Sequence, residues 1–255
     1  MQISAVIVVL NEERRLKDCL KSLTKFDDVI VVDLGSSDQS VEIAKSMKFK
    51  VLSHPWVPIG EMVLPTLMPK MKNDLILRMD PDEVLPPNLF DDLSQLEVGD
   101  KVGIICLPKQ FYFKGKKLDT TIWGGVKPNP QIINRSRVIV TNDVHRAYHC
   151  KEGYERFTLP YRPGNAILHF WIDSYGQLFS KHDRYISLEG ESRYNNGYRF
   201  GWKSLFVPLK GFYQSFIQYS GWRGGWYGWF LSVFFAFYEA RAVLALYRYE
   251  KKILS

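Results

Sequence analysis

"DDVIVVDLGSSDQSVEIAKSM", residues 27–47, contains the three parts of a βα unit in one stretch. Residues 27–33 form an apolar and largely β-branched run, which predicts a strand. The Gly/Ser turn at residues 34–40 follows, and Ser37 with Asp38 marks the start of a helix over residues 41–47. This order of strand, turn and helix predicts one layer of a parallel sheet together with its covering helix.

Similar patterns precede and follow this stretch. Residues 3–10, "ISAVIVVL", predict a strand that is buried on both faces, and residues 11–23 space their apolar side chains as a helix does. Further strands are predicted at residues 49–54, 73–80 and 102–113, with a helix at 86–96 and a loop containing a short helix at 55–72. Residues 114–170 then suggest loops and short strands, and residues 175–250 suggest helices rich in aromatic side chains. The alternation predicts an α/β fold with a mainly parallel sheet flanked by helices.

Composition and charge narrow the class of protein. The three cysteines of this 255-residue chain are odd in number, far apart and without CxxC spacing, so they suggest neither a disulfide framework nor a thiolate zinc site. The apolar N-terminal run is too short for a membrane span and has no features of a signal peptide, so we expect a cytoplasmic protein. The formal charge of +7 is concentrated in residues 193–252, where nine Lys or Arg face only two acids.

Acidic turns follow three of the predicted strands, as "LNEE", "DLGSSD" and "RMDPDE". Right-handed crossovers place these turns at one edge of a parallel sheet, where such sheets bind their ligands. Asp80 and Asp82 flank Pro81, and two carboxylates so close repel each other unless a cation lies between them. A hard divalent ion, Mg²⁺ or Mn²⁺, shared with substrate phosphates suits this site. A solvated turn with helix-capping acids is the alternative.

Three segments in this order resemble a known family: "VIVVLNEE" at residues 6–13, "VIVVDLGSSDQSVEIA" at 29–44 and "LILRMDPDEVLPPNL" at 75–89. They are similar to the motifs of nucleotide-sugar glycosyltransferases of the GT-A (Rossmann-like) fold, inverting family two. The short bacterial enzymes that add sugars to lipopolysaccharide core or related glycans are the nearest likeness. The resemblance covers roughly the first hundred residues and continues weakly to about residue 240.

The resemblance implies a set of binding residues. The turns after the first two strands would hold the nucleoside through Asn11, Glu12, Asp33, Gly35, Ser36 and Asp38. Asp80 and Asp82 would bind the Mg²⁺ or Mn²⁺ ion that neutralises the diphosphate of a UDP-sugar. His169, at the end of a late strand, would complete the metal shell or pack in the interior. Arg78 would help to bind the diphosphate or pair with the neighbouring acids.

The catalytic base is where this chain departs from the family. Family members carry an acid in a "VHE"-like element, whereas the corresponding stretch here, "TNDVHRAYHC", has Arg146 at that position. Asp143, Glu83 and His145 are the candidates for the general base that takes the proton of the acceptor hydroxyl. If no acid faces the acceptor, the alternative is a non-catalytic relative that binds a sugar nucleotide or a glycan.

The expected organisation is a GT-A catalytic domain over residues 1–175 and a helical extension over 176–255. Within the first, the donor half is about 1–100 and the acceptor half about 101–175. The stretch 218–252 contains three of the seven tryptophans, with an apolar stripe at Trp226, Phe230, Val233, Phe237, Leu244 and Tyr247. It would pack on the catalytic body or lie in the interface of an anionic membrane. Glu239 and Arg241 argue against a transmembrane span.

Taken together, these features predict a metal-dependent inverting glycosyltransferase. It would move a sugar from a UDP-sugar to a glycan or lipid-linked glycan in cell-envelope polysaccharide or lipopolysaccharide synthesis. We expect it in the cytoplasm, peripheral on the inner face of the membrane. No RNA-binding motif accompanies the basic aromatic tail, so nucleic acid is not an expected partner.

Overall fold

The computed structural model describes residues 2–141 and 147–254. The chain divides into two compact units, of which the first contains residues 1–110 and 126–171 and the second contains residues 111–125 and 172–255. The stretch 142–146, which includes the candidate bases Asp143 and His145 and also Arg146, lies outside the described residues.

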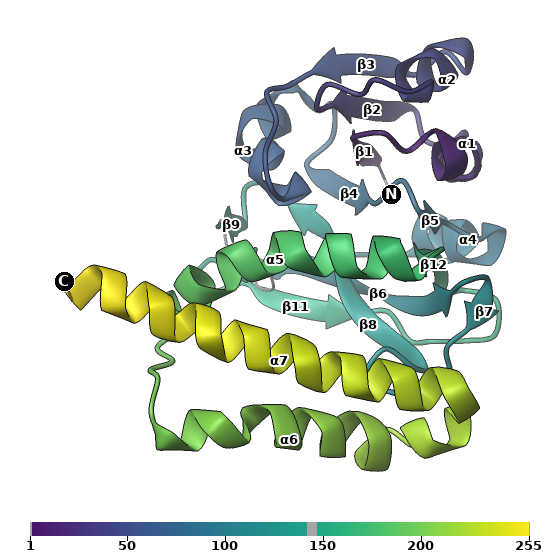
Figure 1. Ribbon diagram of the computed structural model, residues 1–255. Coiled ribbons are helices and arrows are strands. Elements are labelled where there is room, and N and C mark those ends of the chain that lie inside the picture. Colours follow the sequence, from purple (N-terminus) through teal and green to yellow (C-terminus); the bar gives the residue numbers. More distant parts are fainter. Residues whose placement is uncertain (1, 142–146, 255) are drawn as a thin grey trace. The chain divides into compact units, whose positions relative to one another are not determined.

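The first unit is built on a sheet whose parallel half follows the predicted βα pattern (Figure 1). The strands β1 (Ile3–Val9), β2 (Asp28–Asp33), β3 (Lys50–Ser53) and β4 (Leu75–Met79) pair in parallel in the order β3-β2-β1-β4. The helices α1 (Glu13–Ser22), α2 (Ser40–Ser46) and α4 (Pro87–Gln95) follow β1, β2 and the turn after β4. Parallel pairing therefore brings the ends of β1, β2 and β4 to one edge of the sheet, as predicted.

Antiparallel strands extend this sheet beyond β4. β8 (Val126–Asn134) pairs antiparallel with β4 and with β6 (Val102–Phe113), and β11 (Glu155–Thr158) pairs in parallel with β6. The last positions in the strand order are β12 (Ile167–Ile172) and the short edge strand β5 (Glu83–Val84), which pair antiparallel with each other. A separate two-stranded sheet joins β9 (Val138–Val140) to β10 (Tyr148–Cys150). The sheet is thus mixed, with its parallel half next to the acidic turns.

Apolar layers cover both faces of the parallel strands. On one face, Ala5 and Ile7 of β1 join Leu16, Leu20 and other buried side chains in a core cluster with α1 and α4. On the other face, Val6 joins a cluster formed with the short helices η1 (Gly60–Val63) and α3 (Leu64–Leu67), which η2 (Met68–Lys70) follows. This burial of successive residues on opposite faces confirms β1 as a doubly covered strand.

The C-terminal part of the second unit is helical, as predicted for residues 176–255. It contains α5 (Tyr175–Asn195), η3 (Trp202–Phe206), α6 (Val207–Tyr213), the π-helical turn η4 (Gln214–Gln218), η5 (Gly221–Gly224) and α7 (Gly225–Leu254). The long helix α7 lies between α5 and α6 (Figure 1). Among the described residues, one helical stretch, Gly221–Ile253, is long and apolar enough to cross a membrane, by length and composition only, with a mean hydropathy of 1.5.

Residues 111–125 also belong to the helical unit. They include the end of β6, the two-residue strand β7 (Lys116–Lys117) and a turn that packs against the helices. The backbone N–H of Thr121 donates to the carbonyl of Tyr219 at 2.9 Å, and the Trp123 ring meets Phe235 edge-on at 5.7 Å between centroids. Residues 111–125 therefore belong to the second unit, although the residues before and after them in the sequence belong to the first. The expected domain boundary at residue 175 stays a prediction.

Candidate functional site

The loops after β1 and β2 are joined by hydrogen bonds. Asn11 has a left-handed backbone with φ of 57°, and its side-chain oxygen accepts from the N–H of Ser37 at 2.8 Å. In return, the N–H of Asn11 donates to the Ser36 hydroxyl at 3.0 Å, and that of Glu12 donates to the Ser40 hydroxyl at 2.8 Å. Asn is among the few residues that adopt this left-handed conformation readily. The two predicted nucleoside loops therefore form one polar surface.

The two aspartates of the second loop hold its backbone in place. Asp33 accepts from the N–H groups of Gly35 at 3.2 Å and Ser36 at 2.9 Å, in a turn that requires φ of 95° at Gly35. Asp38 accepts from the N–H of Glu13 and from that of Ser40, both at 3.0 Å. Burial by itself raises the pKa of Asp38, but these hydrogen bonds outweigh burial and lower it. Asp38 thus keeps its charge and ties the two loops together.

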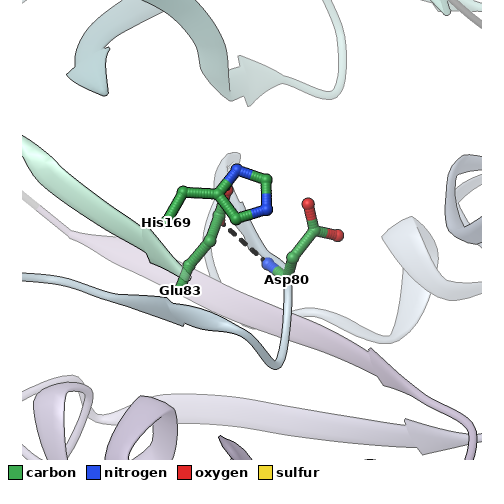
Figure 2. Close-up of side chains that lie close together, drawn as sticks. All are labelled: Asp80, Glu83 and His169. Carbon is green, nitrogen blue, oxygen red and sulfur yellow. Dashed lines mark hydrogen bonds and ion pairs between the residues drawn. The ribbon is translucent and has the colours of Figure 1, made fainter. Parts of the chain in front are cut away.

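The third acidic turn is closed by reciprocal hydrogen bonds. The N–H of Glu83 donates to the carbonyl of Asp80, and the N–H of Asp80 donates to the Glu83 carboxylate, both at 3.0 Å. The pairing of β5 with β12 sets Glu83 opposite His169, and the N–H of Phe170 donates to the Asp82 carbonyl at 2.8 Å. A histidine more than eighty residues along the chain is thereby fixed beside the acids, as Figure 2 shows.

Asp80, Glu83 and His169 form a cluster that could hold a metal ion, with ligand atoms within 4.8 Å of one another. The imidazole lies between two acids, since Nδ1 is 3.6 Å from Glu83 Oε1 and Nε2 is 3.3 Å from Asp82 Oδ1. Asp82 and His169 are buried, at 8% and 6% exposure, whereas Asp80 is half-buried. All three residues that were expected to bind the metal, Asp80, Asp82 and His169, are therefore close together.

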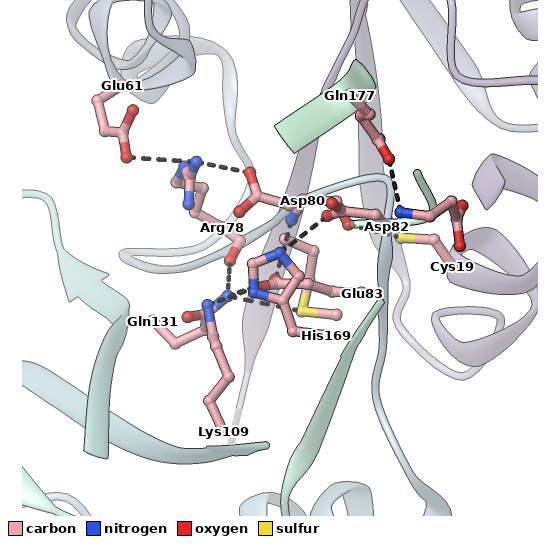
Figure 3. Close-up of polar contacts among 12 residues, drawn as sticks. Cys19, Glu61, Arg78, Asp80, Asp82, Glu83, Lys109, Gln131, His169 and Gln177 are labelled. Carbon is pink, nitrogen blue, oxygen red and sulfur yellow. Dashed lines mark hydrogen bonds and ion pairs between the residues drawn. The ribbon is translucent and has the colours of Figure 1, made fainter. Parts of the chain in front are cut away.

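Glu83 is the most enclosed of these acids, with none of its surface exposed. Its Oε1 forms an ion pair with Lys109 of β6, and its Oε2 accepts from the side-chain amide of Gln131 in β8 at 2.8 Å. Lys109 is itself 3% exposed. A carboxylate with both oxygens engaged and no contact with solvent is suited to holding its neighbours in position. Figure 3 shows this network.

Arg78 lies between two acids. Its guanidinium is 2.6 Å from Asp80 Oδ1 and 3.2 Å from Glu61 Oε1 (Figure 3). Burial alone would lower the pKa of Arg78, but the neighbouring acidic groups, Asp80 first and Glu61 next, together raise it. For Asp80, burial would raise the pKa, but the positive charges around it, Arg78 first and then Lys109, together lower it, so the carboxylate stays ionised. Of the two roles expected for Arg78, the pairing with neighbouring acids is present.

Sequence reasoning missed Glu61, Lys109 and Gln131. A lysine and a glutamine within the otherwise apolar strand "VGIICLPKQFYF" were a usable signal for Lys109, because a charge inside a buried strand requires a partner. Glu61 and Gln131 had no such signal, since their roles depend on which strands and loops become neighbours.

Acids predominate among the side chains of this mostly buried cluster. Glu61, Asp80, Asp82 and Glu83 meet here, and Arg78 and Lys109 pair with three of them. Like charges this close repel each other, and a bound cation relieves that repulsion. Carboxylates together with an imidazole are suitable ligands for Mn²⁺ or Mg²⁺. The residues present therefore fit a divalent metal ion.

A mainly parallel sheet with polar loops and a carboxylate cluster at its strand ends is the architecture of GT-A enzymes that use nucleotide sugars. The family model described as Glycosyl transferase family 2 matches residues 4–152, more than half of the chain, and the chain belongs to that family. The predicted fold and family are confirmed, and the family is one of enzymes.

Several proteins resemble the chain over part of its length. An uncharacterized glycosyltransferase of Rickettsia bellii (strain RML369-C) is 37% identical over 97 residues, and one of Rickettsia typhi (strain ATCC VR-144 / Wilmington) is 36% identical over 97 residues. Each alignment covers 37% of this chain and 32% of the relative, so the chain matches about a third of the length of these relatives.

Among solved structures, glucosyl-3-phosphoglycerate synthase from Mycobacterium tuberculosis in complex with Mg²⁺ and uridine diphosphate is 24% identical. The match covers 45% of this chain and 44% of that chain with a TM-score of 0.34, and this partial likeness carries no inference about ligands here.

Proposed function

We propose that this protein is a metal-dependent inverting glycosyltransferase that uses a UDP-sugar. The proposal depends mainly on one observation: Asp80, Glu83 and His169 form a cluster that could hold a metal ion, with Asp82 3.3 Å from the imidazole, at the sheet edge that also carries the loops of Asn11 and Asp33. The donor class follows from the family, whose members act on nucleotide sugars according to the resemblance described above.

In this proposal Asp80, Asp82 and Nε2 of His169 would hold Mg²⁺ or Mn²⁺. When bound, the ion supplies positive charge that stabilises the diphosphate leaving group. Glu83 lies 3.6 Å from the other imidazole nitrogen, and in this proposal it would orient the ring, as partners of metal-bound histidines generally do. Lys109 and Gln131 in turn hold Glu83. The elements that support the site are thus rigid strands, which suits preorganised catalysis.

The nucleoside would bind along the joined loops through Asn11, Glu12, Asp33, Gly35, Ser36 and Asp38. Asp33 and Asp38 contribute mainly by fixing the backbone, since their carboxylates accept from loop N–H groups. Arg78 keeps one oxygen of Asp80 in place. Because Glu83 is buried and engaged, we assign the general base to Asp143 or His145, which precede β10 in the chain.

We further propose that the acceptor is a glycan or lipid-linked glycan of the cell envelope and that the enzyme acts in the cytoplasm at the inner face of the membrane. The arginine at residue 146 motivates a second candidate function, a relative that binds a sugar nucleotide or a glycan without transferring sugar. Donor turnover with acceptor extracts distinguishes the two, because only the transferase releases UDP in proportion to acceptor added.

Calorimetry tests the site itself. UDP-sugar should bind in the presence of Mn²⁺, and EDTA should abolish binding. Asp82→Asn should weaken binding at least about tenfold, because it removes one ligand charge at the metal. Asp91→Asn in α4, an exposed acid outside the cluster, is the matched control and should bind as the wild type does. Affinity that is independent of metal and unchanged in Asp82→Asn would refute the proposed site.

A further inference from the structure

The helical unit directs a row of large apolar side chains outward. Along η3, α6 and η4 these residues recur every three or four positions, which places them on one side of the helical run. Their exposed fractions are high for apolar residues: Trp202 71%, Leu205 65%, Phe206 55%, Leu209 68%, Tyr213 52% and Ile217 47%. A surface helix of a globular protein ordinarily turns this side inward, so the row requires a partner.

Small residues occupy the inward side of the same run. Gly211 and Ser215 are buried there, and a Cβ at Gly211 would lie 3.2 Å from Cγ of Glu239 and 3.3 Å from the ring of Phe235. The hydroxyl of Ser215 is 2.9 Å from that of Ser232 in α7. The run therefore packs closely on α7 through small side chains, while the large side chains of the row stay about half exposed or more.

The neighbouring helical stretch carries a second exposed row. Trp222 of η5 is 54% exposed, and Trp226, Trp229, Val233 and Phe237 of α7 are between 38% and 62% exposed. The spacing is again three or four residues, as on one side of a helix. We call the exposed apolar residues of the first row, within 202–217, the aromatic face; the second row, within 222–237, lies on the adjoining helical stretch.

Charge identifies the partner of the aromatic face. Residues 192–238 contain no Asp or Glu, yet they contain the cations Arg193, Arg199, Lys203, Lys210 and Arg223. Arg193 is paired with Glu189 and Glu239, whereas Lys203, Lys210 and Arg223 are exposed within or beside the two rows. Surfaces that enter the headgroup region of anionic membranes combine Trp and Tyr with Lys and Arg and lack acidic residues, as this one does.

Buried polar contacts tie α7 to α5. Glu189 of α5 is 1% exposed, accepts from the hydroxyl of Tyr238, and pairs with Arg193 at 2.8 Å. Arg193 also contacts Glu239 of α7 at 3.1 Å. These contacts hold α7 within a layer that includes the charged helix α5, which does not suit insertion of α7 alone across a bilayer.

We propose that the aromatic face docks on an anionic lipid bilayer, with the η3–α6–η4 run lying along the membrane surface. The run at residues 202–217, which the sequence-based expectation for residues 218–252 did not include, supplies the most exposed apolar side chains. This inference concerns the helical unit only and holds whether or not the first unit transfers sugar.

Flotation of the full chain with lipid vesicles tests the proposal. The protein should float with vesicles of phosphatidylcholine and phosphatidylglycerol and much less with pure phosphatidylcholine. The triple variant Trp202→Ser, Leu205→Ser, Leu209→Ser should lose at least about tenfold in partitioning, because it removes the most exposed apolar area. Lys203→Glu with Lys210→Glu should weaken binding most at low salt.

Matched variants outside the aromatic face complete the experiment. Trp56→Ser with Tyr161→Ser removes comparably exposed aromatic residues from the first unit, at 59% and 54% exposure, and should float as the wild type does. Circular dichroism melts should show that the triple variant keeps the wild-type unfolding midpoint. Three results would overturn the proposal: no flotation of the wild type, equal flotation of the triple variant, or membrane association that survives alkaline carbonate extraction. A wild-type dimer that the triple variant dissociates without vesicles would also overturn it.

Discussion

Replacing Lys109 by methionine should severely destabilise the first unit. The ammonium group forms an ion pair with Glu83, and the two side chains are 4% and 0% exposed. Methionine fills a similar volume but leaves the Glu83 carboxylate with neutral donors, the N–H of Asp80 and the amide of Gln131, in place of the cation. Removing one partner of a buried pair costs about 3–5 kcal/mol, because the remaining charge stays buried without compensation.

A loss of this size corresponds to a fall in melting temperature of roughly 6–20 °C, since about 1 kcal/mol shifts a domain of this length by about 2–4 °C. Removing both charges in Glu83→Gln with Lys109→Met should recover much of the loss, because no uncompensated charge then remains. Lys72→Met is the matched control: Lys72 pairs with Asp27, but both side chains are more than half exposed, and the variant should unfold at the wild-type midpoint.

Urea unfolding at pH 7 measures these differences. EDTA is included so that metal binding adds nothing to the stability of the folded state. If Lys109→Met unfolds at the midpoint of Lys72→Met, or if the double variant is less stable than Lys109→Met, the buried pair does not have the role described here.

Three further predictions concern other parts of the chain. Gly228→Ala would place a Cβ 1.9 Å from the carbonyl oxygen of Gly221, so the melting temperature in circular dichroism should fall, whereas Gly201→Ala, which meets open space, should not change it. Tyr238→Phe removes a hydrogen bond to the buried Glu189 and should cost about 1–3 kcal/mol in urea unfolding; a stability equal to the wild type would contradict that role. Because the pKa of Asp38 is lowered from 3.8, its stabilisation is complete above that value and is lost as the pH falls through the lowered pKa. The stability difference between wild type and Asp38→Asn should therefore be constant above about pH 5 and shrink toward about pH 3, and a difference that grows on acidification would refute the assignment.

The parallel half of the fold was predictable because its signals are local. The run at residues 3–10 and the helix spacing of Leu16 and Leu20 are complete within a few turns of chain, and the strand predicted at residues 102–113 has those bounds in the structure. The antiparallel pairing of β8 with β4 and β6 had no local signal. Strand neighbours in that region depend on contacts between distant segments, which a single sequence does not display.

The contrast between local signals and long-range contacts also explains which site residues could be predicted from the sequence. Asp80, Asp82 and His169 were recognisable from their chemistry and from the motif around them, whereas Lys109, Gln131 and Glu61 became identifiable only once the strands were placed side by side. In the helical unit, the sequence pattern at residues 202–217 predicts an apolar stripe along one side of the helices. It does not show whether that side faces the protein interior or the solvent. Buried Gly211 and Ser215 decide that direction, because they form the packed side.

The pairing of β5 with β12 also has a consequence for biosynthesis. The chain emerges from the ribosome starting at its N-terminus, so the loops around Asn11 and Asp33 can form early, while the acidic turn at Asp80–Glu83 has to wait for Lys109, Gln131 and finally His169. A nascent chain stalled before residue 169 would lack the strand that pairs with β5 and holds the acidic turn. Such an intermediate should be poorly ordered in this region, and the cluster would assemble only after residue 169 had been translated.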